Sequence, residues 1–201
     1  CHSNVAIGDC AMAGSTPGNY NVAVGRYSLY NNCSTRNTAL GYYSLYANTG
    51  PDNTAVGYAS LGSNTSGYYN VAVGRGALED NATGNVNTAV GYCALHENCA
   101  DNNTAVGAYA LLCNTTGTTN IAVGRNALCT NTTASDNTAV GYHALFLNCT
   151  GYSNTSLGNY SLCSNTTGYE HTALGMHAMC KNTTAIRSTA IGFKALFNQT
   201  T

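Results

Sequence analysis

The sequence predicts an all-β fold, a parallel β-solenoid whose twelve turns of 16–17 residues form one repeat array over residues 1–201. Three observations lead to this prediction. The pattern Asn-(Thr/Val/Ile)-Ala-(Val/Ile/Leu)-Gly returns twelve times with small departures, its glycines lie 16 or 17 residues apart, and Ala or Ser followed by Leu or Met comes three residues after each glycine. The glycines are Gly8, Gly25, Gly41, Gly57, Gly74, Gly91, Gly107, Gly124, Gly141, Gly158, Gly175 and Gly192. A short period that fills a chain is typical of a solenoid, in which each turn packs on its neighbours.

One repeat, residues 137–153, illustrates the expected turn. Its first residues alternate, which predicts a short strand with Thr138 and Val140 on one face and Ala139 on the other. Residues 144–145 begin a second short segment, and the Asn-Cys-Thr-Gly that follows is a turn signal. We therefore expect two short strands and two bends in each turn.

The column-by-column comparison of the twelve copies predicts a core and an assembly face. The residue before the glycine is always Val, Ile or Leu, and the fourth residue after it is Leu ten times and Met twice, so we expect these columns to face each other as the core. The residue two before the glycine is Ala in all copies but one. A strand face of Asn, Ala and Gly lacks bulk and permits close approach of another chain. The expected assembly face contains Ala39, Ala55, Ala89, Ala105 and Ala139.

The composition argues against several classes of function. Charged residues are 7% of the chain and the net charge is −1, so electrostatics would not draw the chain to nucleic acid or to an anionic membrane. No apolar run approaches the roughly 18 residues of a membrane helix. The histidines form no triad with a serine and an acid, and the carboxylates are scattered. We therefore expect no enzyme activity and no cofactor. We also expect no metal site, since Cys93-x-x-His96-x-x-Cys99 lacks a fourth ligand at suitable spacing.

Ten cysteines without metal-finger spacing favour disulfides and hence an oxidising, extracellular location. Stacked turns about 4.8 Å apart bring equivalent columns within the range that a disulfide spans. The candidate pairs on adjacent turns are Cys113 with Cys129 and Cys163 with Cys180, and Cys93 with Cys99 is a candidate for closing a loop within one turn. An alternative set, Cys99 with Cys113 and Cys149 with Cys163, stays open.

Sequons for N-glycosylation recur in register, which favours a secreted glycoprotein. The seventh residue after the repeat glycine is Asn in ten of twelve copies, and eight of these asparagines head a sequon. The expected glycosylation sites are Asn32, Asn64, Asn81, Asn114, Asn131, Asn148, Asn165 and Asn182.

The repeat Asn-Thr-Ala-Val-Gly-Tyr-x-Ala-Leu resembles the head repeats of trimeric autotransporter adhesins, the YadA-like heads, and is similar to repeats of phage tail-fibre proteins. The resemblance covers all twelve copies. It implies a left-handed β-roll, three chains packed side by side, and a role in adhesion. It also implies that Val56, Val90 and Val140 fill the core of the roll while the small residues between them face the trimer axis.

We therefore expect an extracellular structural glycoprotein, a rod that builds a surface fibre or filament and can be adhesive. Neither terminus carries an evident cap, which favours end-to-end stacking. The alternative is a trimeric adhesin head or a tail-fibre segment that binds a surface ligand. The expected partners are other copies of the chain, with surface glycans or host receptors as the ligands of the adhesive function.

Ice binding is a further, less favoured hypothesis. It is suggested by a regular threonine column, Thr38, Thr54, Thr88, Thr104, Thr138, Thr155, Thr172 and Thr189. This column shares its face with the aliphatic residue beside the glycine, a pattern that is expected to point inward, whereas an ice-binding row has to be exposed.

Overall fold

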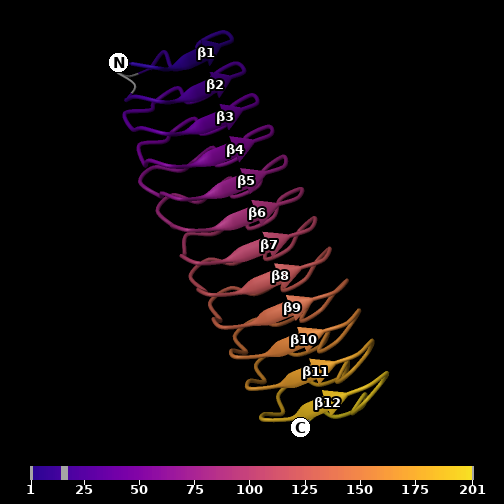
Figure 1. Cartoon of the computed structure of the whole chain (residues 1–201). Coiled ribbons are helices and arrows are strands. Elements are labelled where there is room, and N and C mark those ends of the chain that lie inside the picture. Colours follow the sequence, from indigo (N-terminus) through magenta and orange to yellow (C-terminus); the bar gives the residue numbers. More distant parts are fainter. Residues whose placement is uncertain (1, 15–17, 201) are drawn as a thin grey trace.

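The computed structural model describes residues 2–14 and 18–200, which form a rod of stacked turns with one sheet of twelve parallel strands in sequential order (Figure 1). The strands are β1 (Val5–Ile7), β2 (Val22–Val24), β3 (Thr38–Leu40), β4 (Thr54–Val56), β5 (Val71–Val73), β6 (Thr88–Val90), β7 (Thr104–Val106), β8 (Ile121–Val123), β9 (Thr138–Val140), β10 (Thr155–Leu157), β11 (Thr172–Leu174) and β12 (Thr189–Ile191). The predicted all-β parallel solenoid is confirmed. Within the described ranges, no helix has the length and apolar character to cross a membrane.

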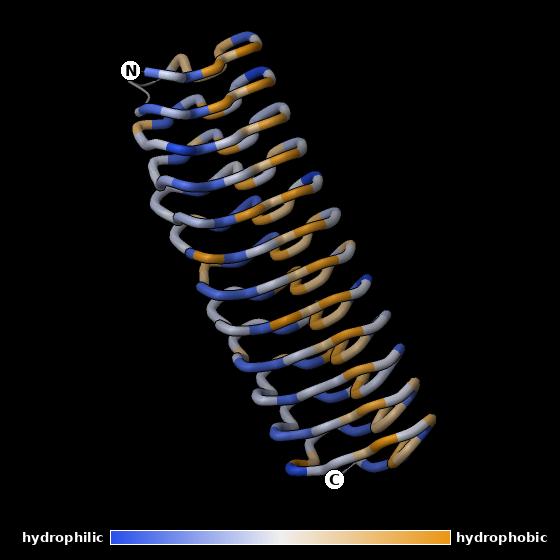
Figure 2. The backbone as a smooth tube through the Cα atoms, in the orientation of Figure 1, coloured by the Kyte–Doolittle hydropathy of each residue, from blue (hydrophilic) through white to orange (hydrophobic). Residues whose placement is uncertain are grey.

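Equivalent residues of neighbouring turns lie beside each other along the rod. Ala39 pairs with Ala55 in β3 and β4, and this register holds through all eleven strand pairs. Backbone hydrogen bonds between turns continue outside the strands, as from the Leu45 N–H to the Ser60 carbonyl at 3.0 Å. The same succession of hydrophilic and hydrophobic segments therefore recurs on every turn (Figure 2).

Each turn contains one strand, so the prediction of two strands per turn is wrong. After the strand and its glycine, the second and fourth residues adopt left-handed backbone conformations, with φ of 59° at Tyr43 and 51° at Leu45 in one turn. Residues with positive φ coil the chain and interrupt an extended run. The segment that was expected to be a second strand is consequently a tight bend.

The leucine column is buried as predicted, except at Leu196 in the last turn, but the inward and outward faces of the strand are exchanged. Leu45 is fully buried and packs in one core cluster with Ala39, whereas Leu40, the residue before the glycine, is 38% exposed. The expected core residues Val56 and Val140 are likewise only partly buried, and Val90 is exposed. The alanines of the expected assembly face lie inside the chain and are fully buried: Ala39, Ala55, Ala89, Ala105 and Ala139. They offer no surface to a partner.

A buried asparagine column explains this orientation. Asn53 precedes β4, and its Oδ1 accepts a hydrogen bond from the backbone N–H of Asn70 on the next turn at 3.0 Å. Its Nδ2 donates to the Gly67 carbonyl at 2.8 Å. Because these contacts hold the Asn53 side chain inside, strand alternation places Ala55 inside and Thr54 and Val56 outside. Polar pairing thus determines the register, and the bulkier aliphatic residues lie outside.

Candidate functional site

The outer face of the sheet is the most regular exposed surface of the rod. We call it the Thr–aliphatic face and define it by the first and third residues of each strand. Its first column contains Val5, Val22, Thr38, Thr54, Val71, Thr88, Thr104, Ile121, Thr138, Thr155, Thr172 and Thr189, and its third-residue column contains Ile7, Val24, Leu40, Val56, Val73, Val90, Val106, Val123, Val140, Leu157, Leu174 and Ile191. Neither column contains a charged residue.

The aliphatic column is uncovered along the length of the rod. Val106, near the middle, is 37% exposed, and Leu157 is 44% exposed. Successive strands keep nearly the same direction, so the face is an even strip (Figure 1). Isolated exposed aliphatic residues are ordinary on protein surfaces, but a contiguous row of them marks an interaction site.

Aromatic and basic side chains border this face at the residue that follows the repeat glycine in eight of the twelve turns. Tyr42 and Tyr58 stack with ring centroids 5.3 Å apart, as expected for an aromatic ladder over the sheet edge. Arg75 lies between Tyr58 and Tyr92, with its guanidinium carbon 5.4 Å and 5.7 Å from the two ring centroids. Cation–π contacts of this kind hold the arginine against the rod at the border of the Thr–aliphatic face.

The eight predicted glycosylation sites lie in the interior, so that prediction is wrong for the folded chain. They belong to a second buried asparagine ladder, in which each Nδ2 from Asn48 onward donates to the Oδ1 of the preceding turn. For Asn64 the acceptor is Asn48, at 2.6 Å, and the same Nδ2 also donates to the Gly67 carbonyl at 2.9 Å. The residues concerned are Asn32, Asn64, Asn81, Asn114, Asn131, Asn148, Asn165 and Asn182, each at most 1% exposed. Their recurrence in register reflects the ladder.

The nine cysteines within the described ranges are free thiols. The structure does place Cys113 and Cys129 on adjacent turns, where the Cys113 N–H donates to the Cys129 carbonyl at 3.2 Å. Cys163 and Cys180 also lie on adjacent turns. Burial, together with the neighbouring Cys113 thiol, raises the pKa of Cys129 to about 11, and burial beside Cys180 raises the pKa of Cys163 to about 11. Such thiols are mostly protonated at neutral pH and react slowly.

The remaining candidate pairs are less closely matched. The Cys99 Sγ lies 3.8 Å from the backbone carbonyl of Asp80, and Cys93 belongs to the tight bend after its glycine, with φ of 49°. Cys149 lies 3.6 Å from the Thr132 hydroxyl. All three pairings and the alternative set stay predictions.

The histidine of the Cys-x-x-His-x-x-Cys segment lies against carboxylates. His96 Nε2 is 3.4 Å from Glu79 and its Nδ1 is 3.6 Å from Asp80. Throughout residues 2–14 and 18–200, no group of three or more His, Cys, Asp and Glu side chains is arranged to hold a metal ion.

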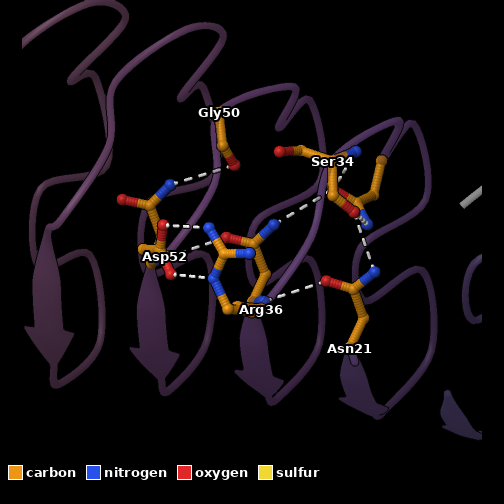
Figure 3. A network of polar contacts seen from close by, with 8 residues as sticks. Asn21, Ser34, Arg36, Gly50 and Asp52 are labelled. Carbon is orange, nitrogen blue, oxygen red and sulfur yellow. Dashed lines mark hydrogen bonds and ion pairs between the residues drawn. The ribbon is translucent and has the colours of Figure 1, made fainter. Parts of the chain in front are cut away.

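Ion pairs join neighbouring turns close to the ends of the strands. The Arg36 guanidinium donates to both carboxylate oxygens of Asp52, at 2.6 and 2.9 Å, beside the buried asparagine ladder that includes Asn21 (Figure 3). Hydrogen bonding to Arg36 lowers the pKa of the Asp52 carboxyl. Bidentate geometry of this kind aligns neighbouring turns more than it stabilises them, because both groups are solvated.

Sequence reasoning missed the Thr–aliphatic face because it assigned the bulkier column to the core. The usable signal was the asparagine that lies two residues before the central residue of the strand in ten of the twelve turns and shares that residue's face. Comparison with models of protein families, with curated proteins and with solved structures found no match for this chain.

Proposed function

We propose that this chain is an extracellular structural rod that associates with further copies of itself through the Thr–aliphatic face, building a surface fibre that can be adhesive. The observation that carries the proposal is the uninterrupted column of outward-facing aliphatic residues on twelve consecutive strands, of which eight are exposed and four are partly buried. The extracellular role rests on the ten cysteines of the sequence.

The size of the face is sufficient for a stable interface. Five residues of extended chain, from the threonine to the residue after the glycine, span about 16 Å, and twelve strands about 4.8 Å apart span about 55 Å. The resulting strip of about 900 Å² is comparable to the roughly 800 Å² that each partner contributes to a standard interface. A second copy offers the same uncharged, even strip, and the resemblance to YadA-like heads supports three copies around an axis.

Sedimentation velocity of the chain tests self-association. We expect the wild type to sediment as a discrete oligomer, and a variant with Val73→Lys, Val90→Lys and Val106→Lys to sediment as a folded monomer, because three like charges would be buried without partners. Thr83→Lys, Thr116→Lys and Thr133→Lys on exposed positions outside the strands serve as the matched control and leave the oligomer intact. A wild type that stays monomeric at high concentration would exclude the proposal.

Ice binding is a second candidate, favoured by one observation. The eight threonines of the column that had been expected to point inward lie on the outer side of the sheet, in line with the aliphatic column. Regular threonine rows on flat solenoids resemble ice-binding surfaces. The two functions use the same face and therefore exclude each other in one particle. Ice-crystal shaping by a monomeric chain, lost on Thr88→Tyr and Thr104→Tyr, would favour this candidate.

A further inference from the structure

The sequence contains twelve Asn-x-Ser/Thr sequons, and the fold divides them into two groups. Nine begin with fully or almost fully buried asparagines, the eight of the interior ladder and Asn154 of the ladder that precedes the strands. The other three begin with exposed asparagines: Asn102, Asn159 and Asn198. None of these three belongs to a buried ladder.

We propose that Asn102, Asn159 and Asn198 are the positions at which the folded rod carries N-linked glycans, and that a glycan on any of the nine buried asparagines prevents folding. The inference deepens the proposed function, since it rests on the extracellular role. All twelve sequons have the same Asn-x-Ser/Thr pattern. The inference therefore depends on whether the amide of each asparagine is buried or exposed in the folded rod.

Glycan transfer changes the acceptor amide. The Asn Nδ2 attacks the anomeric carbon of a lipid-pyrophosphate-linked oligosaccharide, the N–C bond forms, the C–O bond to the pyrophosphate breaks, and the lipid pyrophosphate leaves while Nδ2 loses one proton. The product keeps a single N–H and gains a bulky, hydrated sugar.

A buried ladder asparagine does not tolerate that change. The Nδ2 of Asn114 uses its hydrogens for the Oδ1 of Asn98 at 2.7 Å and for the Gly117 carbonyl at 2.9 Å. Losing one hydrogen removes one of these two buried hydrogen bonds, and the fully enclosed side chain leaves no path for the sugar. Transfer precedes folding in a secretory pathway, so such a chain would be trapped unfolded.

The exposed asparagines have room for the sugar. Asn159 holds its position through Oδ1, which accepts the backbone N–H of Tyr142 at 3.0 Å, and this leaves Nδ2 for transfer. Asn102 follows Asp101 in an exposed bend, with φ of 60°. Asn198 lies in an exposed segment after β12.

The test uses secretion of the full chain, fused to a cleavable signal, from a glycosylating eukaryotic host. A silenced variant replaces the hydroxyl residue of each buried sequon by Ala, which leaves the ladder asparagines intact: Ser34→Ala, Ser66→Ala, Thr83→Ala, Thr116→Ala, Thr133→Ala, Thr150→Ala, Ser156→Ala, Thr167→Ala and Thr184→Ala. Most of these side chains are exposed, and Ser156→Ala gives the alanine found in the other eleven turns. The control replaces Asn102, Asn159 and Asn198 by Gln.

We expect glycans at Asn102, Asn159 and Asn198 alone in the secreted, protease-resistant rod, mapped by enzymatic deglycosylation in ¹⁸O-labelled water. The silenced variant should be secreted at least severalfold better than the wild type, and the control should be secreted as a rod without glycans. A protease-resistant rod with a glycan on a buried asparagine, unmodified exposed sequons, or no gain on silencing would overturn the proposal. The glycan positions can be mapped whether the secreted chain is monomeric or oligomeric. Failure of self-association is therefore distinguished from failure of this inference.

Discussion

The Nδ2 of Asn114 donates to the Oδ1 of Asn98 on the preceding turn at 2.7 Å, and both side chains are fully buried. The contact is one step of a continuous ladder that runs through ten turns, from Asn32 to Asn182. In a low-dielectric interior such bonds are strong, and each unpaired member is costly. The ladder therefore fixes the spacing and register of the turns.

Replacing Asn114 by Ala is expected to lower the free energy of unfolding by about 2–3 kcal/mol, because it removes three hydrogen bonds and leaves buried polar groups of Asn98 and Asn131 without one of their partners. Urea unfolding followed by far-ultraviolet circular dichroism measures the change. Thr116→Ala, an exposed position two residues away, should change stability by at most about 0.5 kcal/mol. Equal changes in the free energy of unfolding for the two variants would show that the buried ladder contributes no more to stability than an exposed side chain does.

The repeat glycine is required by both conformation and space. Gly141 has a φ of 136°, and a Cβ built there would lie 2.6 Å from the backbone of Gly158 on the next turn. Gly141→Ala should therefore cost at least about 3 kcal/mol or prevent folding. Gly62→Ala is the matched control, because Gly62 has no left-handed φ. A Cβ built at Gly62 would have the Ala59 carbonyl oxygen as its nearest neighbour, at 3.2 Å. Thermal unfolding of both variants separates a specific requirement from general intolerance of added methyl groups.

The sequence was sufficient to predict the solenoid, its period and one core column. The invariant glycine, the constant spacing and the leucine column represented by Leu45 each reflect turns that stack in register. These features are visible because every turn repeats the same contacts. The functional face could not be predicted as well, because its assignment depends on which side of a three-residue strand points inward.

Two features were beyond sequence reasoning for physical reasons. Burial of an isolated asparagine side chain is unfavourable, so Asn64 and its equivalents were interpreted as glycosylation sites on the surface. Their burial becomes favourable only because each amide finds hydrogen-bond partners on the neighbouring turns. The left-handed backbone conformation of bulky residues such as Tyr43 and Leu45 could also not be predicted from the sequence. The intrinsic preference of these residues disfavours this conformation, and the packing of the turns imposes it.

Val86 should be a site where substitution stabilises the rod. It is a β-branched, half-exposed residue with φ of 57°, a conformation that asparagine adopts with less strain. Asn102 occupies the equivalent place on the next turn with φ of 60°. Val86→Asn is expected to raise the free energy of unfolding by roughly 1 kcal/mol. Ile186→Asn, at an exposed position without positive φ, controls for the loss of a surface aliphatic residue, and a gain there of the same size would contradict the strain argument.

Histidine replaces asparagine at His171 in the other buried column, the one that precedes the strands, and this makes the rod sensitive to acid. Its Nδ1 accepts the Ser188 N–H at 3.2 Å, and its Nε2 contacts the Ala185 carbonyl at 2.6 Å, so the neutral ring with hydrogen on Nε2 fits the site. Burial lowers the pKa of His171 below its ordinary value, against the opposing effect of these hydrogen bonds.

Since the unfolded histidine titrates near pH 6.5, the unfolded chain binds more protons below that pH, and stability that is complete above about pH 7 should fall between about pH 6.5 and the lower folded pKa. His171→Asn should remove most of this loss and leave a smaller one from His143, whose pKa burial also lowers. Urea midpoints at pH 7.5 and pH 5.0 measure both slopes, with the exposed His2→Asn expected to behave as the wild type. A His171→Asn variant that keeps the full wild-type slope would place the acid sensitivity elsewhere in the rod.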